Sequence, residues 1–134
     1  MRVPLDSDEA DRLVRLVEAG EDVRYSVSLV IVDDAAIRKI NRDALGHDYA
    51  TDVVTFDLGE PEAAILEGEI VISDEYAESE ASTAGHAPEV ELLFYVCHGL
   101  LHLAGYEDDT PAKRRRMLAR QSTYLGRLGR RVAG

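Results

Sequence analysis

Two histidines one helical turn apart are the residues of this chain best suited to chemistry. On a helix, His98 and His102 point from the same face, so both imidazoles can bind one ion. They lie in the most apolar segment of the chain, residues 90–104, where an imidazole without a partner is costly to bury. Gly105 then allows the chain to turn back, which brings Asp108 within reach as an oxygen ligand. The pattern predicts one zinc ion per chain, bound by His98, His102 and Asp108.

Two alternatives to this site stay open at the level of the sequence. The two histidines can instead be core residues whose ring nitrogens hydrogen-bond to the backbone. The third ligand can also be a neighbour of Asp108, because Glu107 and Asp109 are carboxylates as well.

A zinc ion with three protein ligands is suited to hydrolysis. It keeps a fourth position for water and lowers the pKa of that water towards about 7. In the zinc-protease helix H-E-x-x-H, a glutamate directly after the first histidine acts as general base. Gly99 occupies that position here, which argues against proteolysis.

Hydrophobic periodicity and capping residues predict an α+β fold that positions this site. Helices are expected through about residues 7–19, 34–45, 74–83, 88–104 and 111–125, and strands through 25–32, 51–56 and 68–73. The helix over 88–104 is apolar nearly all round, so we expect it to be buried at the centre. Residues 1–134 are expected to form a single domain. We expect a small mixed sheet packed against several helices, with the metal site on the buried central helix.

The charge of the chain is unevenly distributed. The formal net charge of -11 divides into -19 for residues 1–109 and +8 for residues 110–134, which contain no acid. An acidic body repels nucleic acid, whereas a basic helix can attract phosphates or the body itself. If RNA is the substrate, a stripe of Lys113, Arg116 and Arg120 is the best candidate to contact it. In the alternative interpretation, the same side chains pair with the acidic body.

The sequence also carries an expectation for the compartment. Cys97 is the only cysteine, so no intramolecular disulfide can form and a reducing cytoplasm is the default. No apolar run approaches the roughly 18 residues that a membrane span needs, and residues 1–6 lack the features of a signal peptide. We therefore expect a cytoplasmic protein without membrane association.

The segment from His98 to Asp108, HGLLHLAGYED, resembles the signature H-G-x-L-H-L-x-G-Y-D-H of the YbeY endoribonucleases, bacterial ribosomal RNA maturation factors. Further likeness lies upstream, in VIVDD at 30–34, TDVVTF at 51–56 and GEIVIS at 68–73. The resemblance covers about residues 23–125. It implies a metal-dependent hydrolase that cuts single-stranded RNA during small-subunit ribosomal RNA processing. Its partner would be ribosomal RNA or a ribosomal particle.

The chain departs from the family pattern at two positions. Asp108 replaces the third metal-binding histidine, and Leu45 replaces an arginine thought to handle the substrate phosphate, which leucine cannot bind. Arg42, one helical turn earlier, could take over this role. By family position, His86 and Asp52 are candidates for proton transfer. Their structural alternatives are a helix-entry turn for His86 and the start of a strand for Asp52.

Two other functions remain as alternatives. The first is a non-catalytic zinc protein in ribosome assembly, which the lost arginine and the acidic body favour. The second is a zinc-dependent hydrolase of peptides or small molecules, for which a negative surface is no handicap. For a nuclease, either metal-activated water attacks, or the 2′-hydroxyl of the RNA attacks a metal-polarised phosphate. RNA affinity that falls steeply with salt separates a nuclease from both alternatives.

Overall fold

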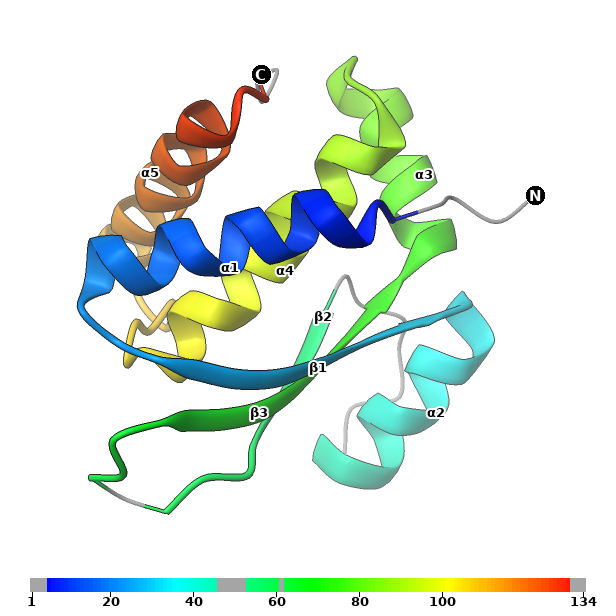
Figure 1. Ribbon diagram of the computed structural model, residues 1–134. Coiled ribbons are helices and arrows are strands. Elements are labelled where there is room, and N and C mark those ends of the chain that lie inside the picture. The colour runs from blue at the N-terminus through cyan, green and yellow to red at the C-terminus, as the bar shows by residue number, and fades with distance from the viewer. Residues whose placement is uncertain (1–4, 46–52, 61, 131–134) are drawn as a thin grey trace.

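The computed structural model describes residues 5–45, 53–60 and 62–130, where helices and strands follow in the expected order (Figure 1). The elements are α1 (Ser7–Glu21), β1 (Tyr25–Val32), α2 (Asp34–Leu45), β2 (Val53–Asp57), β3 (Leu66–Ser73), α3 (Asp74–Ala84), α4 (Pro88–Leu103) and α5 (Pro111–Leu128). The sequence predicted β3 to begin at residue 68. It begins earlier because the Leu66 amide donates to the Arg24 carbonyl at 2.7 Å, which extends the pairing with β1.

The described strands form one mixed sheet in the order β1-β3-β2. The central strand β3 pairs in parallel with β1, with Tyr25 opposite Leu66. On its other side β3 pairs antiparallel with β2, with Val53 opposite Ile72. A parallel pair cannot be closed by a tight turn, and here α2 and β2 lie between its two strands in the sequence. The predicted α+β fold with a small mixed sheet is therefore confirmed.

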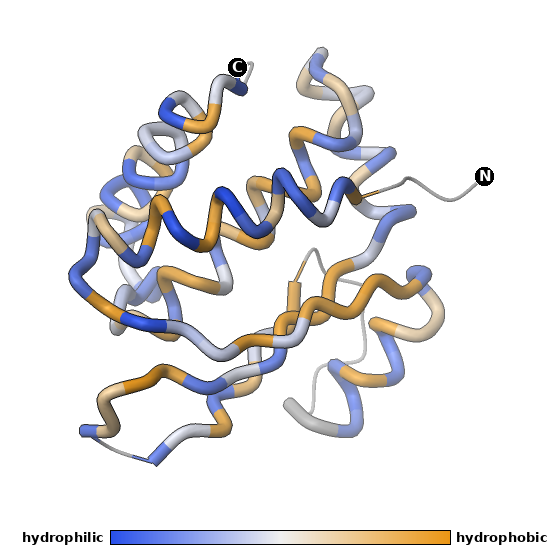
Figure 2. The backbone as a smooth tube through the Cα atoms, in the orientation of Figure 1, coloured by the Kyte–Doolittle hydropathy of each residue, from blue (hydrophilic) through white to orange (hydrophobic). Residues whose placement is uncertain are grey.

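Helices cover both faces of this sheet. Along β3, Ile70 and Ile72 belong to the main apolar cluster, whereas Val71 packs in a smaller cluster with Ile37 of α2. Because successive side chains of a strand point to opposite faces, α2 covers one face and α4 covers the other (Figure 1). Helices α1, α3 and α5 in turn pack against α4. Figure 2 shows hydrophobic residues along the strands and many hydrophilic residues on α1 and α5.

Helix α4 lies at the centre, as its apolar composition predicts. Leu92, Val96 and Leu100 on this helix have no exposed surface. A Cβ atom at Gly99 would lie only 2.8 Å from the side chain of Ile70 on β3, so helix and strand touch at this point. A glutamate of the zinc-protease kind has no room here. None of the described helices is long and apolar enough to cross a membrane.

Candidate metal centre

Three potential ligands meet where α4 ends. His98 and His102 occupy its last two turns, and Gly105, at φ 104°, then reverses the chain towards Asp108. The Nε2 atoms of the two imidazoles are 2.9 Å apart. The Oδ2 atom of Asp108 lies 3.5 Å from each of them. All three side chains are half-buried, so the cluster is open to solvent on one side.

Two carbonyl groups fix the orientation of the imidazoles. The Nδ1 atom of His102 lies 3.1 Å from the backbone oxygen of Tyr106, and Nδ1 of His98 lies 3.4 Å from Oε1 of Gln121. The amide of Gln121 is itself held, because its Nε2 donates to the Phe94 carbonyl at 3.0 Å. Carbonyl oxygens only accept, so each Nδ1 carries the proton and each Nε2 presents a lone pair.

This donor set fits a divalent transition metal such as zinc. Two lone-pair nitrogens that face each other at 2.9 Å cannot hydrogen-bond, whereas a cation between them satisfies both. Tetrahedral zinc with bonds of 2.0–2.1 Å places its ligands about 3.3 Å apart. The observed separations of 2.9 and 3.5 Å bracket this value. Magnesium and calcium prefer all-oxygen ligand sets, so two imidazoles argue for a softer ion.

The two acidic neighbours of Asp108 do not join the cluster. Lys113 contacts both, with Nζ 2.8 Å from Oε2 of Glu107 and 3.2 Å from Oδ1 of Asp109. Each of these carboxylates is well exposed. Of the three successive acids, the structure brings only Asp108 to the histidines within the described residues.

A groove of about 360 Å³ runs beside the histidines, between α4 and the edge strand β2. Its lining combines His98, His102 and Leu103 of α4 with Val53, Val54, Thr55 and Asp57 of β2. The groove therefore gives a substrate access to the open side of the cluster.

The other candidates from the sequence lie away from this cluster or outside the described residues. His86 precedes α4, at the opposite end from His102, and its Nε2 pairs with the carboxylate of Glu91. Both of these side chains are buried, which agrees with the helix-entry alternative. Arg42 lies on α2, behind the sheet as seen from α4, and contacts Asp43. Asp52 lies outside the described residues, as does the side chain of Leu45.

The three cations of the predicted basic stripe on α5 have different partners. Lys113 pairs with the carboxylates described above, and NH2 of Arg120 lies 2.8 Å from Oε2 of Glu21. Arg116 instead places its guanidinium 5.4 Å from the centre of the Tyr106 ring. Pairing with the acidic body, the alternative considered from the sequence, thus holds for two of the three cations.

One residue near the site that the sequence did not indicate is Glu21, at the end of α1. It accepts hydrogen bonds from the hydroxyls of Tyr106 and Tyr124 and from Nε of Arg120. Burial raises the pKa of this carboxyl, but the hydrogen bonds outweigh burial and leave its pKa below the ordinary value. Gln121 was missed as well. Its signal is a polar residue on the buried face of α5, between Met117 and Leu125.

Comparison with known proteins identifies relatives over nearly the whole chain. Residues 6–129 match the family model described as Endoribonuclease YbeY. A protein of that name from Chlorobaculum parvum is 45% identical over 120 residues, covering 90% of this chain and 82% of the relative. Another from Brevibacillus brevis is 35% identical over 144 residues, covering 94% and 91%. The fold is similar to the solution structure of a Thermotoga maritima protein, with a TM-score of 0.65 and 29% identity, covering 95% and 85%.

Proposed function

Because this chain belongs to the YbeY endoribonuclease family, we propose that it cleaves single-stranded RNA at a zinc site formed by His98, His102 and Asp108. The observation that carries the proposal is the convergence of two imidazole nitrogens and one carboxylate oxygen, 2.9–3.5 Å apart, beside an open groove. A bound zinc ion would supply an activated water or polarise a phosphoryl oxygen of the RNA.

The protein residues have distinct tasks in this reaction. Gln121 and the Tyr106 carbonyl keep the Nε2 lone pairs of the histidines aimed at one point. Asp108 adds one negative charge, so the site with its ion carries less positive charge than the three-histidine site of the family pattern. We therefore expect weaker polarisation of the phosphate and a reduced rate. The groove between α4 and β2 would orient the RNA strand against the open side of the cluster.

We place this activity in the maturation of small-subunit ribosomal RNA, with ribosomal RNA or a ribosomal particle as partner. The support is membership of the family. A cytoplasmic location suits Cys97, which is a free, buried thiol. Residues 1–134 are proposed to act as one domain, since α1, α3, α4, α5 and the sheet contribute to one apolar core.

The test is metal analysis of the purified protein, with RNA cleavage measured in parallel for the wild type, His102→Ala and Asp109→Asn. The control removes an exposed carboxylate that contacts Lys113 rather than the histidines. We expect about one zinc per chain and metal-dependent cleavage in the wild type and the control, and loss of both in His102→Ala. Zinc bound without cleavage would favour the non-catalytic assembly protein. Full cleavage by His102→Ala would contradict the proposed site.

A further inference from the structure

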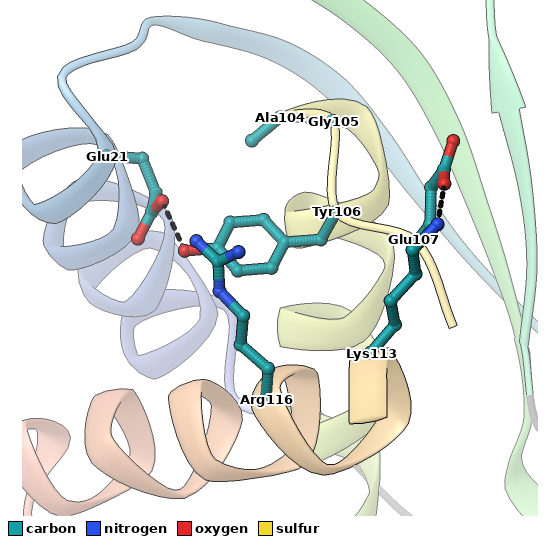
Figure 3. A pocket seen from close by; sticks show the side chains of 7 residues that line it. All are labelled: Glu21, Ala104, Gly105, Tyr106, Glu107, Lys113 and Arg116. Atoms are coloured by element: carbon teal, nitrogen blue, oxygen red, sulfur yellow. Dashed lines mark hydrogen bonds and ion pairs between the residues drawn. The ribbon is translucent and has the colours of Figure 1, made fainter. Parts of the chain in front are cut away.

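A second hollow, of about 350 Å³, shares no lining residue with the groove. Figure 3 shows the side chains that line it. It is lined by Glu21, Ala104, Gly105, Tyr106, Glu107, Lys113 and Arg116. Figure 3 shows Arg116 and Lys113 rising from α5 towards the Tyr106 ring and Glu107. A Cβ atom at Gly105 would meet nothing within 4 Å, so this side of the hollow is open.

The charged groups of this hollow differ in how far they are neutralised. Glu21 accepts hydrogen bonds from three side chains, and Glu107 pairs with Lys113. No described residue offers a carboxylate to Arg116 within ion-pair distance. Its guanidinium lies 5.4 Å from the Tyr106 ring centre and is exposed to solvent. The hollow therefore presents an aromatic ring and, over it, an exposed flat cation without a carboxylate partner among the described residues.

Tyr106 connects this hollow to the candidate metal centre. The ring of Tyr106 lines the hollow, whereas its backbone oxygen lies 3.1 Å from Nδ1 of His102. Asp108 follows two residues later, and two residues of chain span at most about 7 Å. The hollow and the candidate ligands are therefore linked through Tyr106.

We propose that this hollow binds an unstacked base of the single-stranded RNA, next to the nucleotide that is cleaved. The inference rests on the proposed function, since it assumes that RNA is the substrate. Single-stranded RNA is recognised by stacking of its bases on aromatic rings and on guanidinium planes, as Tyr106 and Arg116 offer here. A phosphate fits less well, because the lining holds two carboxylates, Glu21 and Glu107, beside two cations, Lys113 and Arg116, and so offers an anion no net positive charge. An uncharged base does not need a net positive charge, and its amino group can donate to the exposed Glu107 beside Lys113.

The test is the affinity of the zinc-loaded protein for a short 2′-O-methyl oligonucleotide, which has no free 2′-hydroxyl, measured by fluorescence anisotropy over a range of salt concentrations. Because metal-activated water does not need that hydroxyl, the intactness of the oligonucleotide is checked after each titration. We expect Tyr106→Leu to lower the affinity about tenfold without changing its salt dependence, because stacking releases no counterions. Tyr106→Phe keeps the ring but loses the hydrogen bond to Glu21, and it should retain more affinity than Tyr106→Leu. Zinc content is measured for each variant, so that a lost ion is not mistaken for lost stacking.

Arg116→Ala is tested against Arg115→Ala, which removes the same charge from the neighbouring exposed position of α5. We expect Arg116→Ala to weaken binding about fivefold more than Arg115→Ala. Equal effects of the two variants would overturn the proposal, as would wild-type affinity in Tyr106→Leu. The effect of Arg116→Ala is also measured with an oligomer of abasic sites, which has phosphates but no bases. If the variant lowers the affinity for this oligomer as much as for the normal oligonucleotide, the hollow binds a phosphate and the proposal is overturned. Failure of the wild type to cleave RNA would contradict the proposed function without affecting these binding results.

Discussion

The hydroxyl of Tyr106 donates a hydrogen bond of 2.9 Å to Glu21, a residue 85 positions earlier in the chain. Through this bond, the end of α1 holds the loop that carries Asp108. Tyr106 also provides the carbonyl that orients His102. The position of the candidate metal ligands therefore depends on a contact with the first helix.

We expect Glu21→Gln to lower the free energy of unfolding at pH 7 by about 1–3 kcal/mol, since charge-assisted hydrogen bonds are lost. Burial raises the pKa of Glu21, but hydrogen bonds from Tyr124, Tyr106 and Arg120 bring it below its ordinary value of 4.5. The ionised carboxylate thus stabilises the fold fully above the unfolded-state pKa, and this stabilisation is lost as pH falls through the folded-state pKa. Urea unfolding from pH 7 to pH 3.5 measures the effect.

The matched control for this experiment is Glu80→Gln, which removes the same charge from an exposed position of α3. It should change the free energy of unfolding by less than about 0.5 kcal/mol at every pH. The wild type should lose its stability advantage over Glu21→Gln as the pH falls. An advantage that grew instead would contradict the lowered pKa of Glu21.

Gln121→Leu should weaken zinc binding about 10- to 100-fold, because the leucine leaves His98 without the acceptor that selects its tautomer. Ser122→Ala, at an exposed neighbouring position, should bind zinc as the wild type does. Competition with a chelating dye gives both affinities. Equal affinities in the two variants would show that Gln121 does not position the imidazole.

Asp108→Asn should weaken zinc binding, whereas Glu107→Gln and Asp109→Asn should leave it within about twofold of the wild type. The reason is geometric, since only Asp108 places a carboxylate oxygen 3.5 Å from both imidazoles. Asp108→His restores the family ligand set and should retain zinc. The same competition assay applies, and a uniform response of the three acids would point to a different third ligand.

Gly99→Glu introduces the glutamate of the protease-type helix and should destabilise the fold by about 3 kcal/mol or more. Its Cβ would lie 2.8 Å from Ile70, and its charge would enter the core. Gly126→Ala is the control on α5, where a Cβ meets nothing within 4 Å and alanine should stabilise the helix by about 0.5–1 kcal/mol. Denaturant unfolding measures both, and a folded Gly99→Glu of wild-type stability would contradict the packing argument.

Features of the fold and the site that depend on residues close together in the sequence could be predicted. The spacing of His98 and His102 and the turn at Gly105 are local features, and they predicted the cluster that the structure contains. The contacts of Glu21 and Gln121 were not predictable, because they join helices that are distant in the sequence. For the same reason, charge counting predicted a basic surface on α5 but not which of its cations are neutralised.

The hydrogen bond from His98 to Gln121 sets an order of events during synthesis. A chain grows from its N-terminus and its parts begin to fold as they are made. Both histidines therefore exist before Gln121, the residue that orients one of them. An unfinished chain that ends before α5 carries the ligands but not this support. We therefore expect such an unfinished chain to bind zinc more weakly than the complete protein, in which α5 has docked.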